Sequence, residues 1–276
     1  MSLHFSKMHG IGNDFVVVDC RARTFALAPV QIARLGDRHT GVGFDQLLTI
    51  EPARDPSCAF YYGIYNSDGS PSGQCGNGVR CVAAWLRRAG ALKAGTTTRL
   101  ESPSGPVAVA LLDDGRVRVD MGEPDFDARH VPVNLPQGDT YTVLIEGRRV
   151  DFGVVSMGNP HAVIEVGDVA CAPLTTLGRS LSADPAFPEG CNVGFVQVID
   201  RAHVMLRVWE RGAGATLACG TGACAAVAVL RARGAVEDEV AVTLPGGTLG
   251  ISWAGAGHAL WMTGPAAFVY EGDIDE

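Results

Sequence analysis

The chain has 276 residues, of which 47% are apolar and 19% charged, the balance of an ordinary globular protein. Its net charge of −8 and the lack of a Lys/Arg cluster exclude the basic footprint of a nucleic-acid-binding protein. The chain contains no apolar run of about 18 residues and begins without the pattern of a secretion signal. We therefore expect a cytoplasmic protein that is not inserted in a membrane.

The first half of the chain alternates strand patterns with glycine-rich turns. Two strands are expected within 4–19, joined by a glycine turn at 10–12, and a short helix at 30–35. Further strands are expected at 47–50, 59–65, 97–101, 107–112 and 116–121. A helix is expected to start at Cys75-Gly76-Asn77-Gly78 and to end before Gly90.

The second half repeats this alternation after a Gly-, Pro- and acid-rich boundary at 122–127. Strands are expected at 141–145, 149–155, 162–166, 193–198, 203–209, 240–244, 248–252 and 258–263, with a loop at 172–190. The segment 266–274 is one strand too many for this half, so we assign it to the first. The predicted fold is α+β, with an N-terminal domain of 1–121 plus 265–276 and a C-terminal domain of 122–264.

A glycine-rich stretch late in the chain delivers a cysteine to the start of a helix. Residues 210–234 read ERGAGATLACGTGACAAVAVLRARG, where an Ala-rich run follows Cys219 and two arginines precede Gly234. Cys219 thus lies where unpaired N–H groups and the positive end of the helix dipole point. That position favours the thiolate over the thiol, and it also favours a bound anion.

The first half contains the same construction. Residues 75–90 read CGNGVRCVAAWLRRAG, and Cys75 lies 144 residues before Cys219. Three more pairs keep nearly the same offset in the same order: 12–13 with 158–159, Gln46 with Asn192, and 103–105 with 245–247. The agreement predicts an internal duplication, with two similar domains related by a pseudo-twofold axis and both thiols aimed into the cleft between them.

Two thiols that face each other suit one reaction, in which a proton leaves one face of a carbon atom and a proton returns to the other face. Backbone N–H groups at 76–77 and 220–221 are expected to bind a carboxylate and stabilise the charge that develops beside it. His161 is either a supporting base or an ordinary loop histidine, and Glu210-Arg211 is either part of the site or a solvated pair. The other cysteines are expected to be small buried hydrophobic residues, namely Cys20, Cys58, Cys81, Cys171, Cys191 and Cys224.

Six stretches resemble the diaminopimelate epimerases, a family of two-cysteine amino-acid epimerases. They are KMHGIGNDFVVVD (7–19), GVGFDQLL (41–48), NSDGS…QCGNGVRC (66–81), MGNPHAV (157–163), CNVGFV (191–196) and ERGAGATLACGTGAC (210–224). The C-G-x-G element is shared with related racemases and isomerases, whereas GNDF, NSDGS, MGNPH and ERG together are typical of this family. Phe44 and Pro71 depart from the usual pattern, but neither occupies a matched catalytic position.

The resemblance implies interconversion of LL- and meso-2,6-diaminopimelate, on the lysine and peptidoglycan precursor route, with no cofactor or metal. It implies that Cys75 and Cys219 are the acid–base pair and that His161 and Glu210 support catalysis. It also implies a homodimer with Tyr270 near the contact, and a sheet wrapped around a central helix in each domain. The residues implied to bind substrate are Asn13, Gln46, Asn66, Gly76, Asn77, Asn159, Asn192, Glu210, Arg211, Gly220 and Thr221.

Other functions remain open on the sequence alone. A sister activity would be a proline or hydroxyproline epimerase, or an isomerase of the same fold. A cysteine-based zinc module is disfavoured by the cysteine spacings, and a binding protein that exchanges no protons is the third alternative. Neither nucleic acid nor a membrane is expected as a partner. We also hypothesise that Cys75 and Cys219 approach closely enough in a closed state to risk oxidation to a disulfide.

Overall fold

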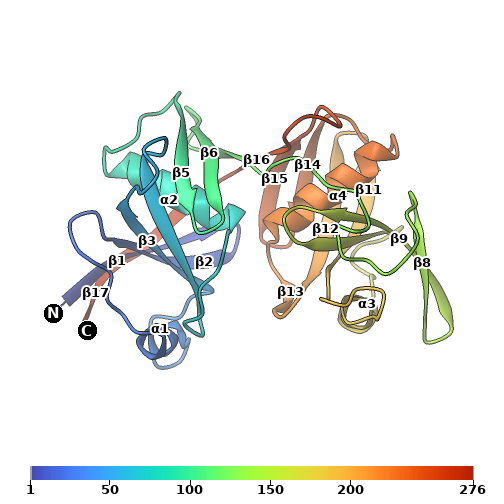
Figure 1. The fold of residues 1–276 in the computed structure, drawn as a ribbon, viewed down its shortest axis with the longest axis horizontal. Coiled ribbons are helices and arrows are strands. Elements are labelled where there is room, and N and C mark those ends of the chain that lie inside the picture. The colour runs from blue at the N-terminus through green and yellow to red at the C-terminus, as the bar shows by residue number, and fades with distance from the viewer. Residues whose placement is uncertain (1, 276) are drawn as a thin grey trace. The chain divides into compact units, whose positions relative to one another are not determined.

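Hairpin-linked strands and two long helices form a mixed, sheet-dominated α+β fold in the computed structural model, which describes residues 2–275 (Figure 1). The chain divides into two compact units. Unit 1 comprises Met1–Asp120 and Thr263–Glu276, and unit 2 comprises Met121–Met262. No helix within residues 2–275 has the length and apolar character needed to cross a membrane.

Unit 1 is one mixed sheet with a long helix, α2 (Gly76–Arg88), and a short one, α1 (Pro29–Gly36). Its strands pair in the order β17-β1-β2-β3-β4-β5-β6-β7, with β2–β3 and β4–β5 parallel and the other pairs antiparallel. The strands are β1 (Ser2–Gly10), β2 (Asn13–Asp19), β3 (Gln46–Pro52), β4 (Phe60–Asn66), β5 (Thr97–Ser102), β6 (Gly105–Leu111), β7 (Val117–Asp120) and β17 (Ala267–Asp275).

Unit 2 is built on a second mixed sheet around α4 (Gly220–Ala232). Its strands pair in the order β8-β9-β10-β11-β12-β14-β15, with β10–β11 and β12–β14 parallel, and β13 adds to β12. The strands are β8 (Tyr141–Ile145), β9 (Arg148–Ser156), β10 (Pro160–Glu165), β11 (Asn192–Asp200), β12 (His203–Glu210), β13 (Gly214–Thr216), β14 (Glu239–Leu244) and β15 (Gly247–Ser252), and β16 (Trp261–Gly264) follows.

Both long helices lie inside the curve of their sheets (Figure 1). Helix α2 packs against β1, β2, β3, β6 and β7, so strands from both ends of the pairing order reach it. Helix α4 likewise packs against β9, β10, β11, β12 and β15. It is buried on every side from Gly222 to Leu230, as expected of a small-residue, apolar helix in a core.

The structure corrects three details of the sequence prediction. The segment 172–190 is not an unstructured loop, because it contains a π-helical turn (Leu174–Gly178) and the short helix α3 (Arg179–Ser182). The Gly-rich run after Glu210 contains a strand, β13. Cys171 is exposed rather than buried, whereas the other five cysteines expected in the core are buried there.

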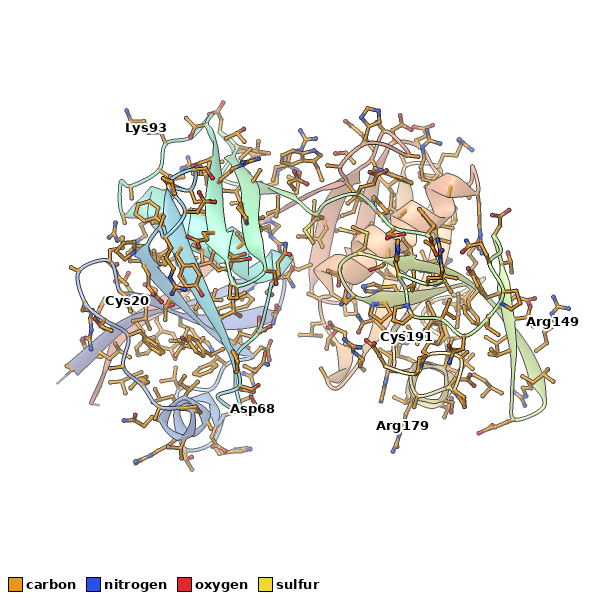
Figure 2. The ribbon with its side chains drawn as sticks, in the orientation of Figure 1. Cys20, Asp68, Lys93, Arg149, Arg179 and Cys191 are labelled. Atoms are coloured by element: carbon orange, nitrogen blue, oxygen red, sulfur yellow. The ribbon has the colours of Figure 1, made fainter. Side chains whose placement is uncertain are left out.

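The side-chain view separates core from surface groups. Cys20 and Cys191, labelled in Figure 2, are buried in units 1 and 2 respectively, whereas Lys93, Arg149 and Arg179 are exposed. The two cysteines are therefore shielded within their own units by neighbouring side chains.

Candidate active site

Cys75 is the N-cap residue of α2. Its backbone is extended, with φ −143° and ψ 111°, and its Sγ accepts a hydrogen bond from the backbone N–H of Gly78 at 3.4 Å. The side chain thus satisfies one of the N–H groups that the first helical turn leaves without an intrahelical partner. Gly76 and Asn77, which follow in the first turn, are buried. The expected placement of a thiol at this helix start is confirmed.

Asn13 lies beside this thiol. It is the first residue of β2, after a two-residue turn in which Ile11 and Gly12 have positive φ, as a type I′ hairpin requires. Its Oδ1 accepts from Asn77 Nδ2 at 3.1 Å and lies 3.8 Å from Cys75 Sγ, which donates to it. The hairpin therefore brings an amide oxygen to the helix start.

Gln46 and Asn66 face each other across the β3–β4 pair. Gln46 Nε2 donates to Asn66 Oδ1 at 3.0 Å, and Asn66 Nδ2 donates to Ser70 Oγ at 3.0 Å. Ser70 in turn donates to the carboxylate of Asp68, which is labelled in Figure 2. Gln46 Oε1 is buried and accepts no hydrogen bond from the described residues. It is an open acceptor for a ligand N–H group.

Cys219 is the N-cap residue of α4 and is only 3% exposed. Its Sγ donates to Glu210 Oε2 at 3.0 Å and lies 3.7 Å from Thr221 Oγ1. Glu210 ends β12, and its other oxygen accepts from Thr216 on β13 at 2.6 Å. The β12–β13 turn therefore holds a carboxylate against the second thiol.

The pKa of the Cys219 thiol is raised well above its usual value, first by burial and then by the charge and hydrogen bond of Glu210. The Gly222 N–H and the Thr221 hydroxyl act in the opposite direction with less effect. The expectation that the helix start favours a thiolate is therefore wrong for Cys219 in this state. Burial and Glu210 therefore favour the protonated form of this thiol.

The remaining polar residues predicted in unit 2 cluster on β10, β11 and the end of β12. His161 is 1% exposed, and its Nε2 lies 3.0 Å from Asn159 Oδ1. Burial, helped by the charge of Arg211, lowers the pKa of His161 to about 3, so the ring is neutral near pH 7. Asn192 Oδ1 accepts from the Arg211 backbone N–H at 2.8 Å. The Arg211 guanidinium donates to the Glu189 carbonyl at 2.8 Å.

The predicted residues thus lie in several small hydrogen-bonded sets, some within unit 1 and some within unit 2. Asn13, Asn77 and Cys75 are linked by hydrogen bonds in unit 1, as are Gln46 and Asn66. Glu210 and Cys219 are linked in unit 2. Tyr270 is 47% exposed on β17, where its ring packs edge-on against Phe5.

Sequence reasoning missed two residues, Thr216 and Asp45. Thr216 bonds Glu210, and Asp45 Oδ2 accepts from Asn13 Nδ2 at 2.7 Å. Asp45 immediately precedes Gln46 within the matched stretch 41–48, and Thr216 lies within the matched stretch 210–224.

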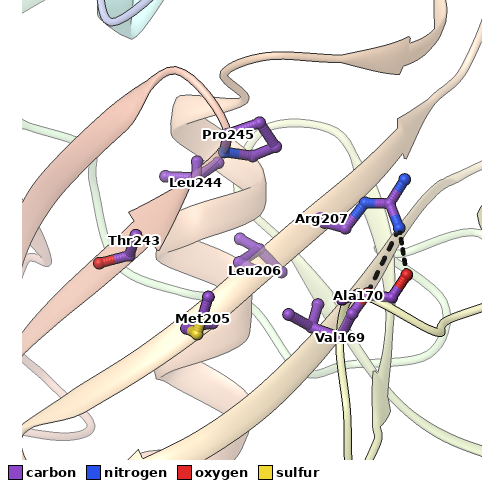
Figure 3. Close-up of a pocket in the computed structure, with 8 residues that line it drawn as sticks. All are labelled: Val169, Ala170, Met205, Leu206, Arg207, Thr243, Leu244 and Pro245. Atoms are coloured by element: carbon purple, nitrogen blue, oxygen red, sulfur yellow. Dashed lines mark hydrogen bonds between the residues drawn. The ribbon is translucent and has the colours of Figure 1, made fainter.

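A separate cavity of about 290 Å³ opens on unit 2, and Figure 3 shows the eight residues that line it. Arg207 is one of them and donates to the carbonyls of Val169 at 3.4 Å and Ala170 at 3.1 Å. The cavity contains none of the residues predicted to be catalytic or to bind substrate. The lining residues are Val169, Ala170, Met205, Leu206, Arg207, Thr243, Leu244 and Pro245.

Known structures share this fold. A hydroxyproline epimerase from Agrobacterium vitis, solved with bound trans-4-hydroxy-L-proline, gives a TM-score of 0.72 at 17% identity over 99% of this chain and 92% of that one. A PhzF-family phenazine biosynthesis protein from Bacillus anthracis gives 0.71 at 15% identity over 100% of both chains. A methylitaconate-delta-isomerase gives 0.63 at 15% identity over 99% of this chain and 95% of that one.

The chain therefore has a fold found in epimerases and isomerases. A family model described as diaminopimelate epimerase matches residues 5–126 and 153–269, which include both cysteine-headed helices. The protein belongs to the diaminopimelate epimerase family, and the resemblance seen in its motifs is confirmed at that level.

Proposed function

We propose that the protein is a cofactor-independent epimerase that interconverts LL- and meso-2,6-diaminopimelate by proton transfer at one α-carbon. The observation that carries the proposal is the repeated placement of a cysteine at the N-cap of the long helix, at Cys75 and at Cys219. The family match supports the choice of substrate. The proposal requires the two sulfur atoms to reach opposite faces of the same carbon atom.

In the proposed reaction, the thiolate of one cysteine takes the α-proton while the thiol of the other cysteine donates a proton to the opposite face. The C–H electron pair becomes the new C–H bond, so one thiolate and one thiol are present before and after. Glu210 accepts the Cys219 proton when Cys219 must act as the base, since its Oε2 already lies 3.0 Å from Sγ. The two roles exchange when the reaction runs in reverse.

Each helix start would contribute electrostatic stabilisation. The N–H groups of Gly76, Asn77, Gly220 and Thr221 lie in the first turns of α2 and α4, where they are available to bind the α-carboxylate of the substrate. Removal of the α-proton pushes negative charge into that carboxylate. Donors fixed before the reaction stabilise this charge without reorganising.

Recognition of the distal amino-acid end is the step that would select diaminopimelate. Arg211 is exposed and anchored through the Glu189 carbonyl, and a guanidinium binds a carboxylate with two parallel hydrogen bonds. Gln46 Oε1 is a buried open acceptor that suits a substrate ammonium group. Asn66, Asn159 and Asn192 would supply the remaining polar contacts.

Two wider features belong to the same proposal. The two sheets share one order of parallel and antiparallel pairs, which supports an internal duplication. We also infer a homodimer through β17, because Val269 and Tyr270 are 57% and 47% exposed on that strand. Sedimentation as a monomer at all concentrations would exclude the dimer.

The test of the proposed function is isotope exchange with LL-diaminopimelate in D₂O, using reduced protein free of metal and pyridoxal phosphate. We expect deuterium at one α-carbon and formation of the meso isomer, with both lost in Cys75→Ala and in Cys219→Ala. Cys81→Ala, which removes a buried cysteine six residues further along α2, is the matched control and should remain active. Full activity in either single active-site variant contradicts the mechanism. Exchange on proline or hydroxyproline, with none on diaminopimelate, would show that the substrate is an imino acid instead.

A further inference from the structure

A network of four charged side chains lies on the amide-nitrogen side of Asn13. Arg38 Nη1 and Nη2 donate to the two carboxylate oxygens of Asp14 at 3.1 and 2.7 Å, and Nη2 also donates to Asp45 Oδ1 at 2.7 Å. Lys7 donates to Asp14 Oδ2 at 2.5 Å and to the Gly43 carbonyl. The remaining oxygen of Asp45, Oδ2, accepts from Asn13 Nδ2 at 2.7 Å and from the Asp14 N–H at 3.1 Å.

These contacts leave the Asn13 amide one orientation. An ionised carboxylate only accepts hydrogen bonds, so the NH2 group of Asn13 must point at Asp45. At the other end, Arg80 donates to Asn77 Oδ1 at 2.9 Å, so the NH2 group of Asn77 must point at Asn13 Oδ1. The order Arg80, Asn77, Asn13, Asp45 is therefore a directional chain of hydrogen bonds from a cation to an anion.

We propose that Asp45 is a positioning residue that holds the Asn13 amide so that its oxygen, and not its NH2 group, faces the thiol of Cys75. The oxygen accepts the S–H hydrogen bond, which stabilises the protonated thiol, whereas an NH2 group at the same place would stabilise the thiolate. Asp45 thereby helps to set which protonation state Cys75 holds before substrate binds. The inference deepens the proposed function, since it rests on Cys75 as an acid–base group.

The charge that Asp45 carries is balanced within the network. Burial acts to raise the pKa of Asp14, but the hydrogen bonds and charges of Arg38 and Lys7 hold it down to about 2. Two cations therefore face two anions. Tyr62 on β4 and Cys81 on α2 also interact with Cys75, and burial raises the pKa of each, that of Cys81 to about 12. Neither titrates near pH 7.

The experiment follows alkylation of Cys75 by iodoacetamide across pH, with mass spectrometry of the Cys75 peptide as the readout. Asn13→Ala removes the acceptor of the S–H bond and should move the midpoint of the profile to lower pH by about 0.5 to 1 unit. Asp45→Ala should give at least half of that shift in the same direction. Both variants are compared with the full-length wild-type protein under reducing conditions.

Two controls separate positioning from other effects. Asp37→Asn changes an aspartate of the same loop, whose carboxylate accepts from the neighbouring His39 and Thr40, and it should leave the midpoint unchanged. The double variant Asn13→Ala/Asp45→Ala distinguishes an action through Asn13 from a direct effect of the Asp45 charge. If Asp45 acts through Asn13, the double variant shifts no further than Asn13→Ala alone.

If Asp45→Ala keeps the wild-type midpoint of Cys75 alkylation, the proposal is wrong. It is also wrong if the double variant shifts further than Asn13→Ala by the full effect of Asp45→Ala. Because the readout needs no substrate, it stands apart from the proposed reaction. If the wild type is inactive on diaminopimelate but the variants show these midpoint shifts, the proposed substrate is wrong and the positioning role stands. If the wild type is active on diaminopimelate but the variants show no midpoint shift, the proposed substrate stands and the positioning role is wrong.

Discussion

The single residues of the site differ in how far their sequence context determines them. Cys75 and Cys219 are N-caps because glycines and an apolar run follow each one directly, and that signal is local. The Cys219 contact with Glu210 depends on the β12–β13 turn and on burial by α4, which are tertiary features. For that reason the position of the thiol was predictable, whereas its protonation state and the roles of Thr216 and Asp45 were not.

Buried His161 makes stability depend on pH. An unfolded histidine has a pKa of about 6.5, and burial lowers that of folded His161 to about 3. Between these values the unfolded chain binds one more proton, so the protein loses stability as pH falls below about 6.5. From pH 7 to pH 5 this group should cost about 2 kcal/mol in the free energy of unfolding. In urea unfolding, His161→Gln should reduce the pH dependence by that amount. Equal pH dependence in wild type and His161→Gln would contradict this.

At the scale of elements, alternation and turn chemistry predicted most strands and both long helices. The extra strand at 266–274 is β17, which pairs antiparallel with β1 from Ser2↔Asp275 onward. The π-helical turn and α3 were missed because their Pro- and Ser-rich sequence has no helical periodicity, and they are held by packing of Leu174 and Leu181 in the unit 2 core. Short elements that depend on tertiary contacts leave little local signal.

The packing of β9 on α4 requires a glycine. A Cβ atom at Gly153 would overlap the Val229 side chain on α4, although the backbone there is ordinary strand. Gly153→Ala should therefore lower the free energy of unfolding by about 1 to 3 kcal/mol, as measured by urea denaturation. Gly167→Ala is the matched control, because its Cβ position meets no described atom within 4 Å apart from those of its own residue and its chain neighbours. Val229→Ala should restore part of the loss, and no recovery in that double variant would mean that the strain lies elsewhere.

At the scale of the whole molecule, the two units repeat one topology. The run β1 to β6 alternates antiparallel and parallel pairs, and β9 to β12 with β14 and β15 follows the same alternation. In each unit the long helix follows the fourth strand of that series. The nearly constant offset of motifs along the sequence was visible without a structure. The wrapping of each sheet around its helix was expected only from the family resemblance, since it arises from long-range pairing that local patterns do not show.

The division of the chain also predicts which pieces fold alone. Unit 2 is continuous, so residues 121–262 should unfold cooperatively by themselves. Residues 1–120 lack β17, which covers β1 and packs Tyr270 and Gly272 against Phe5, so they should not fold. Because Ser2 pairs with Asp275, a linker of about four residues can join 263–276 to 1–120 as a hairpin. That permuted unit 1 should recover a cooperative thermal transition by circular dichroism. A cooperative transition in 1–120 alone would show that β17 is dispensable, and none in 121–262 would show that unit 2 requires unit 1.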